Sequence, residues 1–284
     1  MLDNPNPGFA LADHRVLALQ GPDAVRFAQA QFMSDVAGLA DGHWQWSGWL
    51  TPKGRVIALF ALLKLDSQQL WLLLPDADPE ALAADLRRFV FRSKLTLQAR
   101  LELCVTGAFA NDSQARASAI DVRGEASVTM DLSGEGGTRA LAIAPGAAAV
   151  DDPAALASWR AFDLAHGLPR LDASQVDRWT PQQLSLDRLQ AFSVKKGCYP
   201  GQEIVARTHF LGQAKRGLVL LQGDAPLPNA AEVFAGDRVA GTIVSTALQL
   251  ALAVLPLQRE PDLALSVDGA DVRERPLQTG LARP

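Results

Sequence analysis

The stretch HWQWSGWLTPKGRVIALFALLKL, residues 43–65, places the strongest constraint on how this chain can fold. Trp44 and Trp46 alternate with polar residues, as in a strand with one buried face. The next four residues, TPKG at 51–54, have proline second and glycine fourth, which is the composition of a tight turn. A long apolar run follows at 56–63. The stretch therefore predicts a β-hairpin whose second strand is buried.

Patterns on either side of this hairpin predict further strands and several helices. Strands are expected at 16–20 (VLALQ), at 68–75 (QQLWLLLP) and across 95–105, where apolar and polar residues alternate and Cys104 falls on the face opposite the leucines. Helices are expected to start where proline opens a segment of helical periodicity, at Pro22, Asp78-Pro79, Asp152-Pro153 and Thr180-Pro181. The third of these should end at His166-Gly167. The mixture indicates an α+β protein.

The second half of the chain changes character twice. Residues 106–150 are rich in small residues and predict three short strands, within 117–122, 126–132 and 139–145. The segment QEIVARTHF, starting at Gln202, is compatible with a helix or a strand. From Arg216 onward, glycines separate short apolar segments with little helical periodicity, which predicts a small C-terminal β-barrel or sandwich.

Composition limits the class of function. A chain of 284 residues ordinarily forms two or three domains. The formal net charge of −4 argues against a broad electrostatic grip on nucleic acid, although a local basic patch is compatible with it. No apolar run reaches the ~20 residues of a membrane span, and the start, MLDNPNPGFALADHR, does not resemble a secretion leader. We therefore expect a cytoplasmic protein without direct membrane contact.

The two cysteines do not form a CxxC pair, and the four histidines are scattered. No metal site is expected from such a set, so any iron–sulfur chemistry would involve a partner. Cys104, in a predicted strand, is expected to pack as a small hydrophobic residue.

The segment KKGCYPGQE, residues 195–203, places Cys198 in a sharp, glycine-rich turn. If a helix begins near Gly201, its unpaired N–H groups favour the thiolate, and Lys195 and Lys196 add positive charge nearby. Cys198 is therefore a candidate reactive thiol. A corner that holds a packed and unreactive cysteine explains the same residues, and residue types alone leave both interpretations open.

The region from 167 to 216 resembles the YgfZ family of folate-binding proteins, which are structurally related to the aminomethyltransferase (T-protein) of the glycine cleavage system. The run KGCYPGQE at 196–203 is similar to the family signature KGCYxGQE at every specified position, and VAR at 205–207 and LGQAKR at 211–216 extend it. Four other segments are family-like, GPDAVRFAQAQFMSDV, TPKGRV, GLPRLD and TPQQLSLDRLQAFSVKKGCY. The resemblance covers about two-thirds of the chain.

The resemblance implies a fold and a cofactor. The fold would be a three-domain ring of the T-protein type, with a folate-binding α+β domain from residues 1–50 plus 151–210, an inserted α+β domain at 51–150 and a C-terminal β-barrel at 211–284. The implied cofactor is tetrahydrofolate or a derivative, bound in the central opening of the ring.

The implied function is an accessory role in iron–sulfur cluster assembly or repair, and this role would require Cys198. The role would support cluster enzymes, including one that thiomethylates tRNA. Its partners would be cluster enzymes or assembly proteins, and strong RNA binding is not expected. The alternative is a folate-dependent aminomethyltransferase of the glycine cleavage type, which needs a carboxylate near the folate N5 and a larger C-terminal domain. Whether the protein is itself an enzyme stays open.

The resemblance also implies site residues. Lys196 would assist the thiol of Cys198. Trp159 stands where the family places a folate-contacting tryptophan, although an aromatic residue at helical spacing is, taken alone, more typical of a core. His14 replaces a second family aromatic. The remaining candidate cofactor contacts are Tyr199, Gly201, Gln202, Glu203 and Arg207. We expect an exposed sulfur that faces a cavity bordered by Trp159.

Overall fold

The expected hairpin forms, and it lies at one side of an antiparallel sheet of five described strands. β3 (His43–Leu50) pairs with β4 (Val56–Lys64), and Thr51 N donates to Arg55 O at 2.8 Å in the turn between them. The sheet order is β3-β4-β5-β2-β6, and the other strands are β5 (Gln69–Leu74), β2 (Arg15–Gln20) and β6 (Thr96–Ala99). The computed structural model describes residues 8–124, 126–212, 214–259 and 264–283. The first seven residues, part of the start used to judge secretion, and Gln213 of the LGQAKR segment lie outside the described residues.

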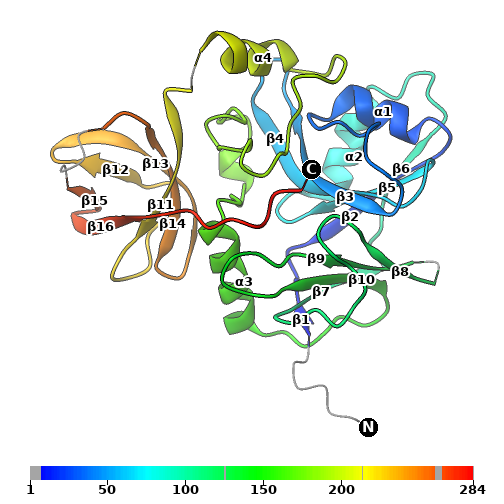
Figure 1. Ribbon diagram of the computed structural model, residues 1–284, viewed down its shortest axis with the longest axis horizontal. Coiled ribbons are helices and arrows are strands. Elements are labelled where there is room, and N and C mark those ends of the chain that lie inside the picture. Colours follow the sequence, from blue (N-terminus) through cyan, green and yellow to red (C-terminus); the bar gives the residue numbers. More distant parts are fainter. Residues whose placement is uncertain (1–7, 125, 213, 260–263, 284) are drawn as a thin grey trace.

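The two faces of this sheet support two separate apolar layers. Leu17 and Leu19 of β2 pack on one face, whereas Val16 and Ala18 pack on the other because side chains alternate along a strand. The first face is covered by the two helices expected after Pro22 and Asp78, α1 (Ala24–Gln31) and α2 (Pro79–Arg87), which Figure 1 shows beside the sheet.

A second antiparallel sheet lies against the opposite face. Its order is β1-β7-β10-β9-β8, with β1 (Phe9–Ala10), β7 (Leu103–Ala108), β10 (Ala140–Pro145), β9 (Ser127–Asp131) and β8 (Asp121–Arg123). The last three are the strands expected within 106–150. Figure 1 shows this sheet below the first one, with α3 (Pro153–Ala165) at its side. Buried residues of both sheets and of α3 join in one core, which includes Trp46, Met130 and Trp159.

Helix α3 begins and ends where the sequence indicates. The Asp152 side chain accepts hydrogen bonds from the backbone N–H groups of Ala154 and Ala155, which would otherwise be unpaired at the helix start. His166 ends the helix, and Gly167 follows with a φ of +73°, a conformation that glycine adopts without strain. These caps fix the position of the side chains that α3 presents to the core.

The single strand expected across 95–105 is wrong, because two strands in different sheets occupy this range. β6 pairs with β2 in the first sheet, and β7 pairs with β10 in the second. A turn between them is closed by a hydrogen bond of 3.2 Å from Leu103 N to Arg100 O. The alternation of apolar and polar residues continues through this turn, where Leu101 is 66% exposed, so the pattern conceals the break.

The helix expected at Thr180-Pro181 is also wrong. Residues 181–190 form consecutive turns instead, and Ser185 and Gln190 adopt φ values of +47° and +56°, which interrupt a right-handed helix. A short 3-10 helix, η1 (Ala173–Gln175), precedes these turns. The segment after KKGCYPG, for which the sequence leaves helix and strand open, is the helix α4 (Gln202–Leu211).

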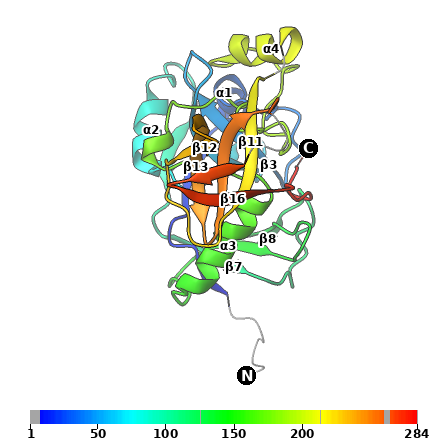
Figure 2. The same cartoon turned by 90° about the vertical axis from the view of Figure 1, so that its left-hand side faces the viewer.

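The C-terminal part forms a closed barrel of six described strands, as expected. Its order is β11-β14-β13-β12-β15-β16, with β11 (Arg216–Gln222), β14 (Leu250–Pro256), β13 (Arg238–Ala247), β12 (Glu232–Ala235), β15 (Leu265–Val267) and β16 (Ala270–Arg275). Figure 1 shows the barrel as a separate lobe next to α3, and in Figure 2 the barrel faces the viewer. The chain then returns to the first sheet, where Trp46 Nε1 donates to Leu281 O at 2.7 Å.

The strand order can be compared with the expected division into domains. The boundary expected between residues 50 and 51 falls in the turn of the β3–β4 hairpin. Each of the two sheets contains strands from both 1–50 and 51–150, and the division of these ranges into a discontinuous domain and an inserted domain stays a prediction. The barrel lies within its expected range, 211–284. Among the described residues, no helix has the length and apolar character needed to span a membrane.

Candidate functional site

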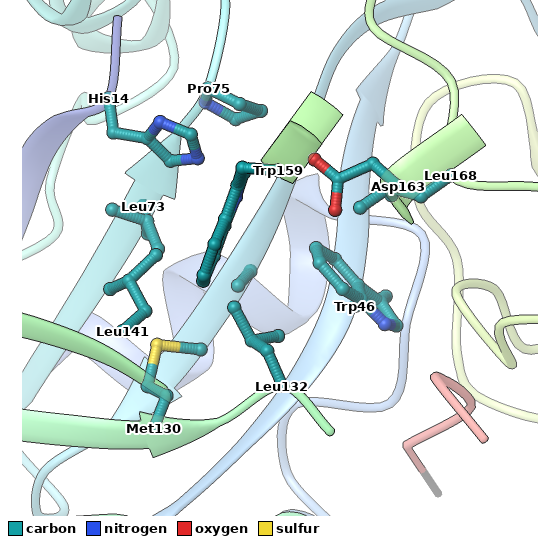
Figure 3. A pocket seen from close by; sticks show the side chains of 11 residues that line it. His14, Trp46, Leu73, Pro75, Met130, Leu132, Leu141, Trp159, Asp163 and Leu168 are labelled. Atoms are coloured by element: carbon teal, nitrogen blue, oxygen red, sulfur yellow. The ribbon is translucent and has the colours of Figure 1, made fainter. Parts of the chain in front are cut away.

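A cavity lies between the two sheets, and α3 forms one of its walls (Figure 3). The first sheet contributes Trp46, Ala61 and Leu73 to its lining. The second sheet contributes Met130 and Leu141. The other lining residues come from α3 and from loops, and they are His14, Pro75, Leu132, Trp159, Asp163 and Leu168. Most of the lining is therefore apolar, with one carboxylate and one imidazole.

The cavity is narrow. Its volume is about 20 Å³. A cavity of that volume holds about one water molecule. A flat ring of the size of a pterin therefore enters only if lining side chains move apart.

Trp159 borders this cavity and is also a core residue. Its side chain is 1% exposed, and the Phe9 ring meets it edge to face at 5.9 Å. Gly107 leaves room for the indole, because a Cβ at that position would lie 3.1 Å from the ring. Figure 3 shows Trp159 between His14 on one side and Asp163 on the other. The two interpretations of Trp159 are thus compatible, and its contact with folate stays a prediction.

Asp163, which is 3% exposed, places a carboxylate in the cavity wall. Its Oδ1 pairs with Nη2 of the buried Arg139 at 2.9 Å. The Arg139 guanidinium in turn lies 4.2 Å from the centre of the Trp159 ring and 3.9 Å from that of Phe162. The other carboxylate oxygen of Asp163, Oδ2, lies 4.0 Å from Arg170 Nη1, which is beyond hydrogen-bond distance. This second oxygen retains capacity to accept a hydrogen bond from a ligand.

A network of charges beside the cavity fixes the position of His14. Asp13 Oδ1 pairs with His14 Nδ1, and Asp13 Oδ2 accepts hydrogen bonds from Arg160 and Arg170, each pair at 2.7 Å. Burial alone would raise the pKa of Asp13, but the hydrogen bonds and charges of His14, Arg170 and Arg160 outweigh it and hold this pKa well below its usual range. Arg170 Nε also contacts both oxygens of Asp76 at 3.0 Å. His14, which replaces the family aromatic, therefore lines the same cavity as Trp159.

Cys198 is exposed in the turn that precedes α4, as expected for a sulfur held at a bend. It is not among the residues that line the cavity bordered by Trp159, contrary to the expectation that it faces this space. The thiol and the cavity are therefore separate features. Cys104 is half-buried, and its Sγ donates to Gly146 O at 3.1 Å, which agrees with a packing role.

Lys196 is 7% exposed, and its ammonium group is used within the fold. Nζ donates to the backbone carbonyls of Gln29, Phe32 and Ser34, the last at 2.9 Å. These carbonyls lie at the end of α1 or just beyond it, where helix C=O groups lack partners in the helix. Burial lowers the pKa of Lys196 to about 8, and the charge of Asp35 partly opposes this shift. These three hydrogen bonds give the ammonium a role within the fold. Its assistance to Cys198 stays a prediction.

Two other signature residues, Tyr199 and Gln202, form hydrogen bonds within the loop that carries Cys198. The Tyr199 hydroxyl donates to Ser193 O at 3.1 Å, and the Tyr199 ring lies 4.9 Å from Lys196 Nζ. Burial raises the pKa of Tyr199 to about 12. Gln202 Nε2 donates to Lys196 O at 3.3 Å. These contacts build the loop that carries Cys198.

The remaining predicted cofactor contacts lie at the start of α4 or along it. Gly201 is the N-cap of this helix, with a φ of +78°. Glu203 and Arg207 are exposed on the helix. Of the predicted cofactor contacts, Trp159 alone lines the cavity, which lacks Tyr199, Gly201, Gln202, Glu203 and Arg207. The structure does not bring the predicted set together, and a folate contact by these five residues stays a prediction.

Asp163 is the candidate that sequence reasoning missed. It follows Trp159 by four residues, so both lie on the same face of α3. The signal available in the sequence was an acidic residue on the buried face of an amphipathic helix. In the part of the chain that the structure describes, no group of three or more His, Cys, Asp or Glu side chains is arranged to hold a metal ion.

Comparison with known families and structures agrees with the observed fold. The family model of the CAF17 C-terminal beta-barrel domain matches residues 215–278. The crystal structure of glycine cleavage system aminomethyltransferase T from Bartonella henselae is similar with a TM-score of 0.76, over 94% of this chain and 83% of that one. The two sequences are 16% identical, so this likeness concerns the fold alone.

Curated relatives extend over most of the chain. An uncharacterized protein of Haemophilus influenzae is 31% identical over 247 residues, which cover 83% of this chain and 82% of the relative. The tRNA-modifying protein YgfZ of Klebsiella pneumoniae is 28% identical over 303 residues, covering 95% and 92% of the two chains. The protein of the same name from Serratia proteamaculans is 29% identical over 263 residues, covering 84% and 79%.

Proposed function

The chain belongs to the YgfZ family, and from this premise we propose that it binds tetrahydrofolate or a derivative and supports iron–sulfur cluster enzymes, including one that modifies tRNA. The observation that carries the proposal is the placement of Asp163 beside Trp159 in a cavity between the two sheets. The name of the relatives, tRNA-modifying protein, supports RNA modification as the process served. The cytoplasm is the proposed location.

The chemistry of the cavity lining fits a reduced folate. A pterin is flat and carries several N–H donors, so Asp163 Oδ2 would accept a hydrogen bond from it while Trp159 and the apolar walls cover the ring. When bound, tetrahydrofolate supplies a carrier for one-carbon units. The residues of this chain would bind and orient the pterin and exclude water from it. Because the cavity is narrow, binding requires that lining side chains shift.

Cys198 would act at the surface, toward a partner protein. Its turn directly precedes α4, and the sulfur is exposed, so that a partner protein can reach it. Lys196 and Tyr199 in the same loop are buried, whereas Cys198 is exposed to solvent. Cys198 would therefore be the reactive group of this loop. The partners proposed are cluster enzymes or proteins that assemble clusters.

Rescue of bacterial cells that lack their own family member tests the role of the thiol. We expect the wild-type chain to restore the thiomethylated fraction of tRNA and Cys198→Ala to fail, with equal protein levels. Cys104→Ala is the matched control, because it removes the other cysteine, and it should rescue like the wild type. Full rescue by Cys198→Ala would refute the thiol role.

One observation favours the alternative, a folate-dependent aminomethyltransferase. Asp163 is a carboxylate in the cavity, and such an enzyme needs one near the folate N5. Incubation of the purified protein with tetrahydrofolate and an aminomethylated lipoyl carrier separates the two functions. Release of ammonia and formation of methylenetetrahydrofolate would favour the transferase, whereas the accessory function predicts neither.

A further inference from the structure

The segment RRFVFRSK, residues 87–94, forms a surface that the proposed function does not use. It begins at the last residue of α2 and continues through the turns that follow. We call it the basic-aromatic surface, and it consists of the exposed residues Arg87, Arg88, Phe89, Phe91, Arg92 and Lys94. No acidic residue occurs in the sequence between Asp85 and Glu102. A chain with a net charge of −4 thus carries a local concentration of positive charge.

Phe91 is the most unusual residue of this surface. Its side chain is 88% exposed, and its φ is +30°, a backbone conformation that bulky residues rarely adopt. Such a conformation is strained, and an exposed ring gains no burial energy to offset the strain. The Arg92 guanidinium lies 5.4 Å from the centre of this ring. The Phe91 ring is therefore exposed to solvent beside the Arg92 cation, and its exposure contributes no packing energy to the fold.

Phe89 provides a second ring, and this one is anchored. It meets the buried Trp49 ring edge to face at 5.9 Å and remains 46% exposed. Arg87 is also held in place, since its Nη2 donates to Leu97 O at 2.9 Å. Among the described residues, the side chains of Arg88, Arg92 and Lys94 form no ion pair, and the Asp23 carboxylate accepts a hydrogen bond from Lys94 N at 2.7 Å and pairs with Arg26. Most of the positive charge of the surface is thus left uncompensated.

We infer that the basic-aromatic surface binds a single-stranded segment of RNA. Exposed aromatic rings stack on unpaired bases, and Arg and Lys side chains meet the phosphates that flank them. This inference rests on the proposed function, because RNA modification favours RNA over an acidic protein as the occupant. The surface continues from α2, which covers one face of the first sheet, whereas residues of the opposite face line the cavity. RNA binding is therefore independent of folate binding.

Fluorescence anisotropy with a labelled anticodon stem-loop RNA tests this inference. We expect Phe91→Ala to weaken binding about tenfold, as for the loss of one base stack. The double variant Arg88→Gln with Arg92→Gln should weaken binding and reduce the dependence on salt, with a slope of log K against log salt that is smaller by roughly 1.4 if each residue meets one phosphate. Phe210→Ala removes an exposed phenylalanine of α4 and is the matched aromatic control. Arg273→Gln with Arg275→Gln removes two exposed cations of the barrel and is the matched charge control.

Both control variants should bind the RNA like the wild type. Equal binding by all variants, or stronger binding of a polyglutamate peptide than of the RNA, would overturn the inference. Titration of the same proteins with tetrahydrofolate distinguishes its failure from that of the proposed function. Folate binding without RNA binding contradicts this inference alone, and RNA binding without folate binding contradicts the proposed function alone.

Discussion

Gly201 and Gly54 approach each other so closely that a Cβ on Gly201 would lie 2.7 Å from the Gly54 Cα. The contact joins the turn of the β3–β4 hairpin to the loop that carries Cys198, since Gly201 is the N-cap of α4. Gly201 also has a φ of +78°, where other residues are strained. The position of the exposed thiol therefore depends on a glycine for two independent reasons.

The first prediction concerns this glycine. Gly201→Ala should lower the free energy of unfolding by about 2 kcal/mol or more, because the added methyl group meets backbone atoms that cannot turn aside. Gly197→Ala, in the same loop, should change it little, since a Cβ there meets no atom within 4 Å. Urea unfolding of both variants measures the difference. Equal losses would contradict the close approach.

The second prediction concerns the two adjacent lysines. Lys196→Met should destabilise the protein by about 3 kcal/mol, because it leaves two buried carbonyls and one partly buried carbonyl without their donor. Lys195→Met should be nearly neutral, since Lys195 is exposed. Urea unfolding again gives the comparison. If Lys195→Met lowers the free energy of unfolding as much as Lys196→Met does, the ammonium of Lys196 does not form these three hydrogen bonds.

The third prediction concerns acid stability. The pKa of Asp13 is lowered in the folded protein, so this carboxylate contributes stability above its unfolded pKa of about 4, and the contribution is lost as pH falls toward the folded value. The unfolding free energy of the wild type should therefore fall more steeply below about pH 4 than that of Asp13→Asn. Asp151→Asn, at an exposed position, should keep the wild-type slope. Parallel slopes for the wild type and Asp13→Asn would show that Asp13 is not held ionised by its neighbours.

The fourth prediction concerns Trp159. Replacement by alanine would remove a core side chain and destabilise the fold by about 3–5 kcal/mol, so Trp159→Phe is the better test. Trp159→Phe should weaken tetrahydrofolate binding by about 1 kcal/mol, which corresponds to one reduced aromatic stack. Phe109→Leu, at a ring 6.0 Å from Trp159 that is not among the cavity-lining residues, is the control and should bind normally. Unchanged affinity of Trp159→Phe, measured by equilibrium titration, would leave Trp159 as a core residue only.

The sequence predicts elements well where periodicity and caps agree. The β3–β4 hairpin and α3 form as expected because a turn composition and an Asp-Pro start mark their limits. The break between β6 and β7 was not predictable, since the alternation of residues continues through the turn at 100–102. Residues 180–190 have the composition of a helix start, but tertiary contacts impose turns with positive φ.

The site was predictable only in part, because proximity in sequence does not give the direction of a side chain. Lys196 adjoins the turn of Cys198 in sequence, yet its ammonium reaches the end of α1. Tyr199 and Gln202 belong to the same signature and serve the loop itself. Asp163 escaped notice because a single acid on a helix is ordinarily solvated, and only the packing of α3 against two sheets buries it.

Equilibrium titration with tetrahydrofolate of the wild type, Asp163→Asn and Cys198→Ala tests the central claim most directly, namely that the cavity binds folate and the exposed thiol serves a separate purpose. We expect the wild type and Cys198→Ala to bind equally, since Cys198 does not line the cavity. Asp163→Asn should bind at least about tenfold more weakly, because a neutral amide replaces the carboxylate that we propose accepts the pterin N–H. Loss of binding in Cys198→Ala together with normal binding in Asp163→Asn would contradict the account.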